Sequence, residues 1–311
     1  MKLGFGLPQR NGVSLRRDIT GMARMAETAG FASLWTYERL LFPVQPSDGM
    51  YGMPGLPWPP IYEECADALT VMAVAAAVTE SLEMGAGVLV ATLHPPVRLA
   101  KTLATIDQVS GGGRLIAGFG TGWSTDEARA AGASFADRGR YLDETLDVLE
   151  AAWGPDPVSY QGESAILDRV IFRPKPVSRI PVILGAPVGG IKALDRIARR
   201  ADGWMSAAIP LPAMTGAWQR IQETAAGHGR DAAAMKLICR GNITFTDAPA
   251  GKDRYPFVGT KDQIVEDIVA CAEAGVDEVV IDVFLQDPIS DIRQMVDTAL
   301  EIHERAIAAG V

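Results

Sequence analysis

The stretch LEMGAGVLVATLHPPVRLAKTLATIDQVSGGGRLIAGFGTGW, residues 82–123, contains one complete strand–helix–strand unit. Residues 82–90 and 114–120 are short apolar runs, which are typical of strands buried on both faces of a parallel sheet. Between them a helix begins at Pro95 and Pro96. Proline is tolerated there because the N–H groups of the first helical turn have no partner within the helix. Its apolar face consists of Leu99, Leu103 and Ile106. The stretch therefore predicts two parallel strands joined by a crossover helix.

The same alternation of apolar runs and helical periodicity continues along the whole chain. Strands are expected at residues 2–8, 31–37, 82–90, 114–120, 180–186, 202–208, 235–245 and 278–284. The helices expected between and after them include 64–79, 190–200, 211–227 and 288–308. Eight strand–helix units in about 300 residues are typical of a (β/α)8 TIM barrel, since a doubly wound sheet usually ends near five or six strands. No linker divides the chain, so we predict one α/β domain over residues 1–311.

Two less regular insertions, residues 42–63 and 154–179, interrupt the alternation. In a TIM barrel the loops that follow strands form the active face, so we expect insertion loops over the C-terminal mouth of the barrel. Residues 42–63 follow the second strand and are rich in Met, Tyr, Trp and Pro. This composition suits a wall or lid for an apolar substrate, and it equally suits a rigid Pro-rich surface loop.

Composition and charge limit the cellular compartments and the kinds of partner that we expect for this protein. The formal net charge of the 311 residues is -9, and no basic run is present, which disfavours nucleic acid and anionic lipid as partners. The longest apolar stretch, residues 68–78, is too short to span a bilayer. The N-terminal residues already read as a strand, so we expect no secretory signal. Three scattered cysteines, Cys65, Cys239 and Cys271, fit a reducing cytoplasm, where we expect this protein.

Alternating glycines at Gly118, Gly120 and Gly122 end the fourth expected strand. A dinucleotide-binding fingerprint would need a third glycine where Trp123 stands, and no phosphate-binding G-x-x-x-x-G-K-[ST] motif occurs. At the mouth of a barrel, these glycines would let the backbone pass close to a ligand, where a Cβ would collide. A strand end that closes a tight turn is the alternative.

A second glycine pair, Gly189 and Gly190, stands between the fifth expected strand and its helix. A helix N-terminus presents backbone N–H groups without partners, and the helix dipole favours an anion there. We therefore expect this end to suit a phosphate, although glycine is common at strand ends in barrels generally.

Four segments carry a resemblance to a known family: residues 26–41, 84–127, 201–204 and 258–281. The chain resembles the luciferase-like monooxygenase superfamily of the bacterial-luciferase type. The motif GFGTGW and the Glu-Arg pair after the second strand are similar to its coenzyme F420-dependent oxidoreductases. The resemblance implies FMN or the deazaflavin F420 in the barrel mouth, a small-molecule substrate and a homodimer. It also implies a flavin or F420 reductase as redox partner.

The resemblance assigns coenzyme-binding positions residue by residue. The peptide bond between Gly87 and Val88 matches a position where the family often has a non-proline cis bond. The positions that the resemblance places against the coenzyme are Gly87, Val88, Val90, Gly120, Gly122, Trp123, Asp126, Gly185, Ala186, Gly189 and Gly190.

The acid–base residues depart from the family pattern. Many F420-dependent members carry Asp-His after the second strand, and this chain has Glu38 and Arg39 there. Arginine stays protonated and cannot act as a base, but it can bind an anion or a carbonyl. Glu38 could donate a proton, bond the coenzyme or pair with Arg39. His94, after the third strand, could supply a proton or cap the following helix. The histidines lack metal-ligand spacing, so we expect no metal.

The leading hypothesis for function is an F420-dependent oxidoreductase that transfers a hydride between the deazaflavin and a small organic substrate. The alternative is an FMN-dependent monooxygenase that needs a separate flavin reductase. Because the Asp-His pair is missing, a coenzyme-binding protein without turnover is a third hypothesis. A barrel lyase or aldolase is disfavoured, because no lysine clearly ends a strand.

Overall fold

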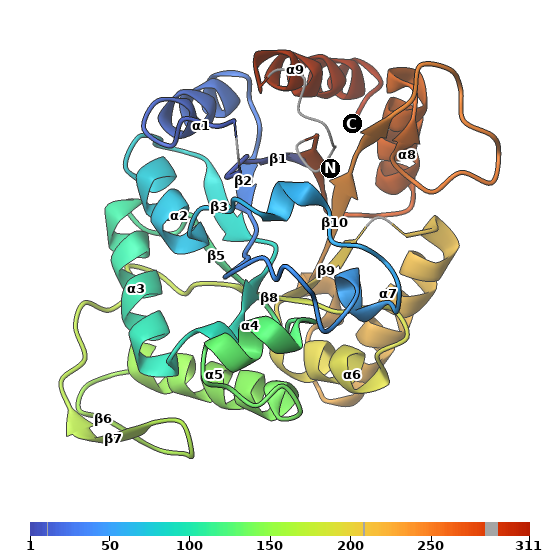
Figure 1. Ribbon diagram of the computed structural model, residues 1–311. Helices are drawn as coiled ribbons and strands as arrows, with labels where there is room; N and C mark the ends of the chain where they lie inside the picture. The colour runs from blue at the N-terminus through green and yellow to red at the C-terminus, as the bar shows by residue number, and fades with distance from the viewer. Residues whose placement is uncertain (11, 208, 284–291) are drawn as a thin grey trace.

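A closed barrel of parallel strands organises the chain. The computed structural model describes residues 1–10, 12–207, 209–283 and 292–311 (Figure 1). The barrel strands of this described part are β1 (Lys2–Gly6), β2 (Ser33–Thr36), β3 (Glu83–Ala86), β5 (Leu115–Gly120), β8 (Val182–Gly185), β9 (Gly203–Ala207), β10 (Lys236–Asn242) and β13 (Glu278–Asp282). Their order is β3-β2-β1-β13-β10-β9-β8-β5, and direct pairing of β3 with β5 closes the ring. The predicted (β/α)8 barrel is confirmed.

Helices surround the strands on the outside (Figure 1). They are α1 (Asp18–Thr28), α2 (Ala68–Ala76), α3 (Pro96–Val109), α4 (Thr125–Ala130), α5 (Arg138–Trp153), α6 (Ile191–Arg200), α7 (Leu211–Gly227), α8 (Lys261–Glu273) and α9 (Ile292–Ala308). Local sequence sets their ends. Thr260 and Gln263 form a reciprocal capping box at the start of α8, and Gly30, with a φ of +85°, follows the end of α1. In the described residues, no helix is long and apolar enough to cross a membrane.

The barrel interior packs around Trp35. Because strand residues alternate between faces, one set of apolar side chains points outward to the helices and another points inward. The inward cluster comprises Trp35, Ile116, Ile183, Met205, Ile238 and Val280. Trp35 is fully buried, and a Cβ on Gly85 would lie 2.4 Å from its ring. The glycine on the neighbouring strand is therefore what admits so large a side chain.

Several expected elements differ in detail. The third strand divides into β3 and a short β4 (Leu89–Val90), and the seventh ends at Asn242, after which β11 (Thr244–Phe245) pairs with β12 (Val258–Gly259). The short helical turns are η1 (Met50–Gly52), η2 (Pro60–Tyr62), η3 (Ala91–Leu93) and η4 (Ala232–Ala234). The ends of the expected strands 202–208 and 278–284, and the start of the expected helix 288–308, lie outside the described residues.

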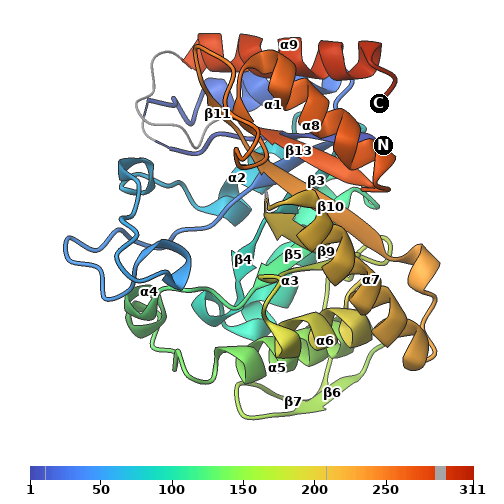
Figure 2. The same ribbon diagram turned by 90° about the vertical axis from the view of Figure 1, so that its right-hand side faces the viewer.

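The two insertions occupy different places. Residues 42–63 extend from the same end of the barrel as α4, at the carboxyl ends of the strands, as expected (Figure 2). Residues 154–179 do not lie over the mouth, which corrects the prediction. They form a hairpin of β6 (Val158–Gln161) and β7 (Ile166–Val170) outside α3 and α5 (Figure 1). This insertion follows a helix rather than a strand, and for that reason it is absent from the active face.

Candidate active site at the carboxyl ends of the strands

Glu38 and His94 form a hydrogen-bonded pair at the mouth of the barrel. Glu38 follows β2 and His94 follows η3, and His94 Nε2 lies 2.8 Å from Glu38 Oε1. The Val90 N–H donates to the other carboxylate oxygen, Oε2, at 2.6 Å. Burial by itself lowers the pKa of His94, but the hydrogen bond and charge of Glu38 outweigh it, so this pKa lies above its ordinary value. The side chain of His94 does not cap α3, so the capping alternative is wrong.

Arg39 pairs with Glu127 rather than with its neighbour Glu38. Arg39 Nη1 lies 2.9 Å from Glu127 Oε2, and both side chains are buried. Arg39 Nε donates to the Glu38 backbone carbonyl, and the Leu40 N–H donates to Glu127 Oε1 at 2.6 Å. Burial raises the pKa of Glu127, opposed by the charge of Arg39 and by the backbone donors. The alternative of a Glu38–Arg39 ion pair is therefore wrong, and the Arg39 charge is neutralised within the protein by Glu127.

Three aromatic rings enclose the Arg39 guanidinium. Its Cζ lies 4.5 Å from the ring centroid of Trp123, 5.6 Å from that of Trp58 and 5.9 Å from that of Tyr62. Trp58 and Trp123 meet edge to face at 4.4 Å. We call Arg39, Trp58, Tyr62, Trp123 and Glu127 the Arg39 cluster. The cluster joins the 42–63 insertion to the rest of the mouth.

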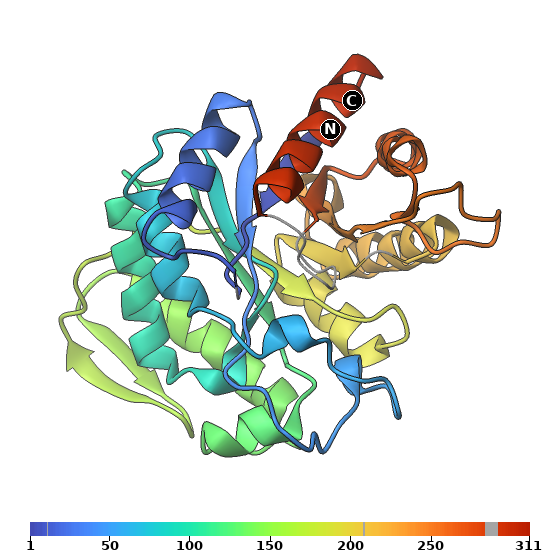
Figure 3. The same ribbon diagram turned by 45° about the horizontal axis from the view of Figure 1, so that its top comes forward.

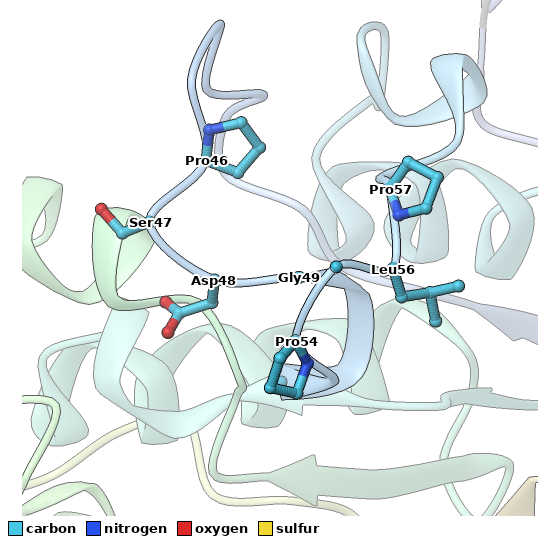
Figure 4. Close-up of a pocket in the computed structure, with 9 residues that line it drawn as sticks. Pro46, Ser47, Asp48, Gly49, Pro54, Leu56 and Pro57 are labelled. Carbon is cyan, nitrogen blue, oxygen red and sulfur yellow. The ribbon is translucent and has the colours of Figure 1, made fainter.

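Asp126 contacts the insertion loop. Its carboxylate accepts hydrogen bonds from the Ser47 N–H at 2.7 Å and the Ser47 hydroxyl at 2.8 Å, which lower the pKa of Asp126. Asp48 accepts in turn from the Thr125 N–H at 2.7 Å. A cavity of about 460 Å³ lies within the loop, with Ser47, Asp48 and Leu56 among its lining residues (Figure 4). The carboxylate expected to bind coenzyme thus fastens the loop to α4.

A bulge between β3 and β4 faces the mouth, and the peptide bond between its two residues, Gly87 and Val88, is cis as the resemblance implies. Arg240 supports it from inside the barrel. Arg240 Nη1 donates to the carbonyl of Gly87 at 2.8 Å and to that of Thr36 at 3.1 Å. Asp282 accepts from Arg240 Nε at 2.9 Å. Sequence reasoning missed Arg240 and Asp282, although a charged residue near the end of each apolar strand was a visible signal.

The alternating glycines make room for this bulge. A Cβ on Gly118 would lie 1.9 Å from the carbonyl oxygen of Ala86, and one on Gly120 would lie 2.6 Å from a methyl of Val88. Gly122, with a φ of +73°, and Gly185 similarly face Val90 and Val88. The space that these glycines leave is therefore needed by neighbouring protein atoms, and their contact with a coenzyme stays a prediction.

Gly120→Ala is expected to lower the free energy of unfolding by about 1–3 kcal/mol, because the new methyl overpacks the site against Val88. Gly189→Ala is the matched control, since nothing lies within 4 Å of its Cβ position, and its effect should stay within about 0.5 kcal/mol. Urea unfolding of both variants measures the difference. Equal stabilities would contradict the packing role of Gly120.

The helix end at Gly189 and Gly190 offers fewer free donors than expected. The Gly190 N–H donates to the Pro187 carbonyl at 3.0 Å, and the Gly190 carbonyl accepts from Leu194 as α6 begins. The carbonyl of Ala186 is also engaged, by Trp204 Nε1 at 3.1 Å. The expectation of a free amide at Gly190 is therefore wrong, and Gly189 is the glycine of this turn that borders open space.

Asn242 supplies an acceptor that the protein leaves unused. It ends β10 two residues after Arg240, so both side chains point into the barrel. Among the described residues, Asn242 Oδ1 is buried and has no hydrogen-bond partner. A buried polar atom of this kind is usually satisfied by a ligand or a water. It therefore fits a bound molecule that presents an N–H or O–H into the mouth. The described residues contain no cluster of side chains that could hold a metal ion.

The barrel and the site define the class: a (β/α)8 protein whose charged and aromatic groups gather at the carboxyl ends of the strands, where barrel enzymes hold their active sites. The chain belongs to the luciferase-like monooxygenase family, whose sequence profile matches residues 1–255. Members of this family are oxidoreductases or monooxygenases.

Individual relatives agree with this assignment. The chain is 34% identical over 190 residues to an uncharacterised protein of Mycobacterium tuberculosis, a match that covers 59% of this chain and 65% of the relative. It is 27% identical over 203 residues to the F420-dependent glucose-6-phosphate dehydrogenase of Nakamurella multipartita, covering 63% of this chain and 54% of that enzyme. The structure of the monooxygenase RslO1 from Streptomyces bottropensis superposes over 100% of both chains with a TM-score of 0.79 at 18% identity, which shows a shared fold.

Proposed function

We propose that this protein is an F420-dependent oxidoreductase that transfers a hydride between the deazaflavin and a small organic substrate. The observation that carries the proposal is the Glu38–His94 pair, whose buried carboxylate accepts from the Val90 N–H of β4, next to the bulge at the barrel mouth. The match to an F420-dependent glucose-6-phosphate dehydrogenase supports the choice of coenzyme. The wider proposal is a single-domain cytoplasmic homodimer that works with an F420 reductase.

The residues at the mouth fit a deazaflavin or flavin ring. Asn242 Oδ1 offers a buried acceptor for a ring N–H, and the Gly87–Val88 bulge offers backbone against which a flat ring system can lie. Gly189 lies beside open space at the start of α6, where the helix dipole favours a phosphate. When bound, F420 supplies the atom that accepts or releases the hydride.

The chain's own contribution is to hold a proton. Glu38 Oε1 bonds His94 Nε2, which orients the imidazole and stabilises its protonated form. His94 Nδ1 has no hydrogen-bond partner in the described part of the chain, so it remains available to a substrate oxygen. In the direction of substrate reduction, His94 would give its Nδ1 proton to that oxygen; in the reverse direction it would take the proton back.

The contacts of Arg39 argue against a main role in binding the substrate. Arg39 already has a carboxylate partner and an aromatic enclosure within the protein. What remains is to hold residues 42–63 over the mouth. The Met, Pro and aromatic side chains of residues 42–63 suit a substrate with an apolar body.

Titration of the purified protein with F420 and with FMN tests the proposal. We expect micromolar or tighter binding of F420 and at least tenfold weaker binding of FMN, measured by coenzyme fluorescence. Asn242→Leu should weaken F420 binding about tenfold, because one hydrogen bond is lost, without lowering the melting temperature. The reverse preference would indicate an FMN-dependent monooxygenase. Failure of both coenzymes to bind would contradict the proposal.

A further inference from the structure

A second cavity opens at the opposite, amino-terminal end of the barrel. Its volume is about 780 Å³, and its apolar wall includes Ile116, Ile183 and Ile238 from three barrel strands. Glu278, the first residue of β13, also lines it. These residues lie at or near the starts of their strands, whereas the Glu38–His94 pair lies beyond strand ends. The cavity is therefore separate from the candidate active site, and no step proposed above uses it.

The Lys and Arg side chains that rim this cavity have partners of their own. Lys2 lies 2.7 Å from Glu83, Arg179 lies 2.8 Å from Asp202, and Lys236 lies 3.0 Å from Asp277. The guanidinium of Arg114 donates to backbone carbonyls and to a threonine hydroxyl. No cation in the described residues forms an ion pair with Glu278, so its carboxyl group stands at this cavity without a direct ion-pair partner.

The carboxyl group of Glu278 is held in a fixed orientation. Its Oε1 accepts hydrogen bonds from Trp35 Nε1 at 2.6 Å and from the Ser33 hydroxyl. Gly4 admits this arrangement, because a Cβ there would lie 2.6 Å from Oε1. The residue is 3% exposed, and burial raises the pKa of Glu278 against the two hydrogen bonds. In the described residues Oε2 has no hydrogen-bond donor.

We propose that this cavity binds a small organic cation, a primary ammonium on a compact apolar body. The ammonium would donate to Glu278 Oε2 and supply the missing charge, and the apolar body would lie against Ile116, Ile183 and Ile238. A buried carboxyl without a counter-charge is costly, and a fixed one at the wall of an apolar cavity is a ready recognition element for an amine. The site goes beyond the proposed oxidoreductase function and does not depend on it.

Isothermal titration calorimetry with benzylamine, and with benzyl alcohol as the neutral analogue of similar shape, tests the site. The protein is kept saturated with whichever coenzyme it binds, so that the mouth is occupied. We expect saturable 1:1 binding of benzylamine and at least tenfold weaker binding of benzyl alcohol. Glu278→Gln, which keeps an acceptor for Trp35 and Ser33, should weaken benzylamine binding at least tenfold.

Glu83→Gln is the matched control, because it removes a carboxylate at the rim of the same cavity and should change the affinity less than threefold. Absence of saturable benzylamine binding, equal affinity for the alcohol, or unchanged binding in Glu278→Gln would overturn the proposal. If Glu278→Gln does not fold, the Ala234→Trp variant tests whether benzylamine binds in this cavity. Ala234 is an exposed lining residue, so the larger side chain should obstruct the cavity and abolish binding without touching Glu278.

Discussion

Arg39→Ala is expected to lower the free energy of unfolding by about 3–5 kcal/mol. Glu127 is 2% exposed, and its Oε2 lies 2.9 Å from Arg39, so removal of the guanidinium leaves a buried carboxylate without its counter-charge. The change also removes the cation that three aromatic rings enclose. Urea denaturation followed by circular dichroism measures the loss.

A double variant separates the lost charge partner from lost packing. Arg39→Met combined with Glu127→Leu replaces the pair by apolar groups of similar size, and such replacements are often nearly neutral. We expect the double variant to recover most of the stability that Arg39→Ala loses. A wild-type melting temperature in Arg39→Ala, together with a raised KM, would instead restore the substrate-anchoring role considered from the sequence.

The Arg39 cluster also explains how the mouth is built. The 42–63 insertion, in blue in Figure 3, has little regular structure. The cluster and the contacts of Ser47 and Asp48 tie it to α4. Asp126 and Glu127, the acidic residues of the first turn of α4, thus act together on the loop. Because these two carboxylates hold the loop in place, they fix the shape of the mouth.

The barrel was predictable because its signal is local and repeated. Each strand is a short apolar run and each helix has a 3.6-residue apolar period, and α6 and α7 lie within a residue of their expected bounds. The place of residues 154–179 depends on chain order rather than on local pattern. The helical periodicity ends at Trp153, where α5 also ends, so the insertion follows a helix and lies away from the mouth.

The glycines show a different limit of sequence reasoning. A pattern of glycines indicates that something lies close to the backbone, but not what that neighbour is. At Gly120 and Gly185 the neighbour is Val88, a residue far away in sequence, brought there by the bulge after β3. The Glu38–His94 and Arg39–Glu127 pairs were hidden for the same reason, because 56 and 88 residues separate their members.

His94→Gln is expected to lower kcat by about 10²–10⁴-fold, the contribution typical of a general acid or base, with little change in coenzyme affinity. The reason is that His94 would hold the transferred proton while other groups bind the coenzyme. Tyr141→Phe is the matched control, since the Tyr141 hydroxyl bonds only the backbone carbonyl of His94, and its kcat should stay near that of the wild type.

Glu38→Gln tests the same pair through pH. The carboxylate raises the pKa of His94, so a rate that needs the protonated imidazole persists to higher pH and falls as pH rises through that raised value. Glutamine keeps an acceptor for the Val90 N–H but removes the charge, so the pKa of His94 should fall and the alkaline decline of kcat should begin at lower pH. A profile of kcat against pH, with the coenzyme dissociation constant measured alongside, detects this shift. An unmoved alkaline limb would mean that His94 does not carry the proton, even if coenzyme binding is intact.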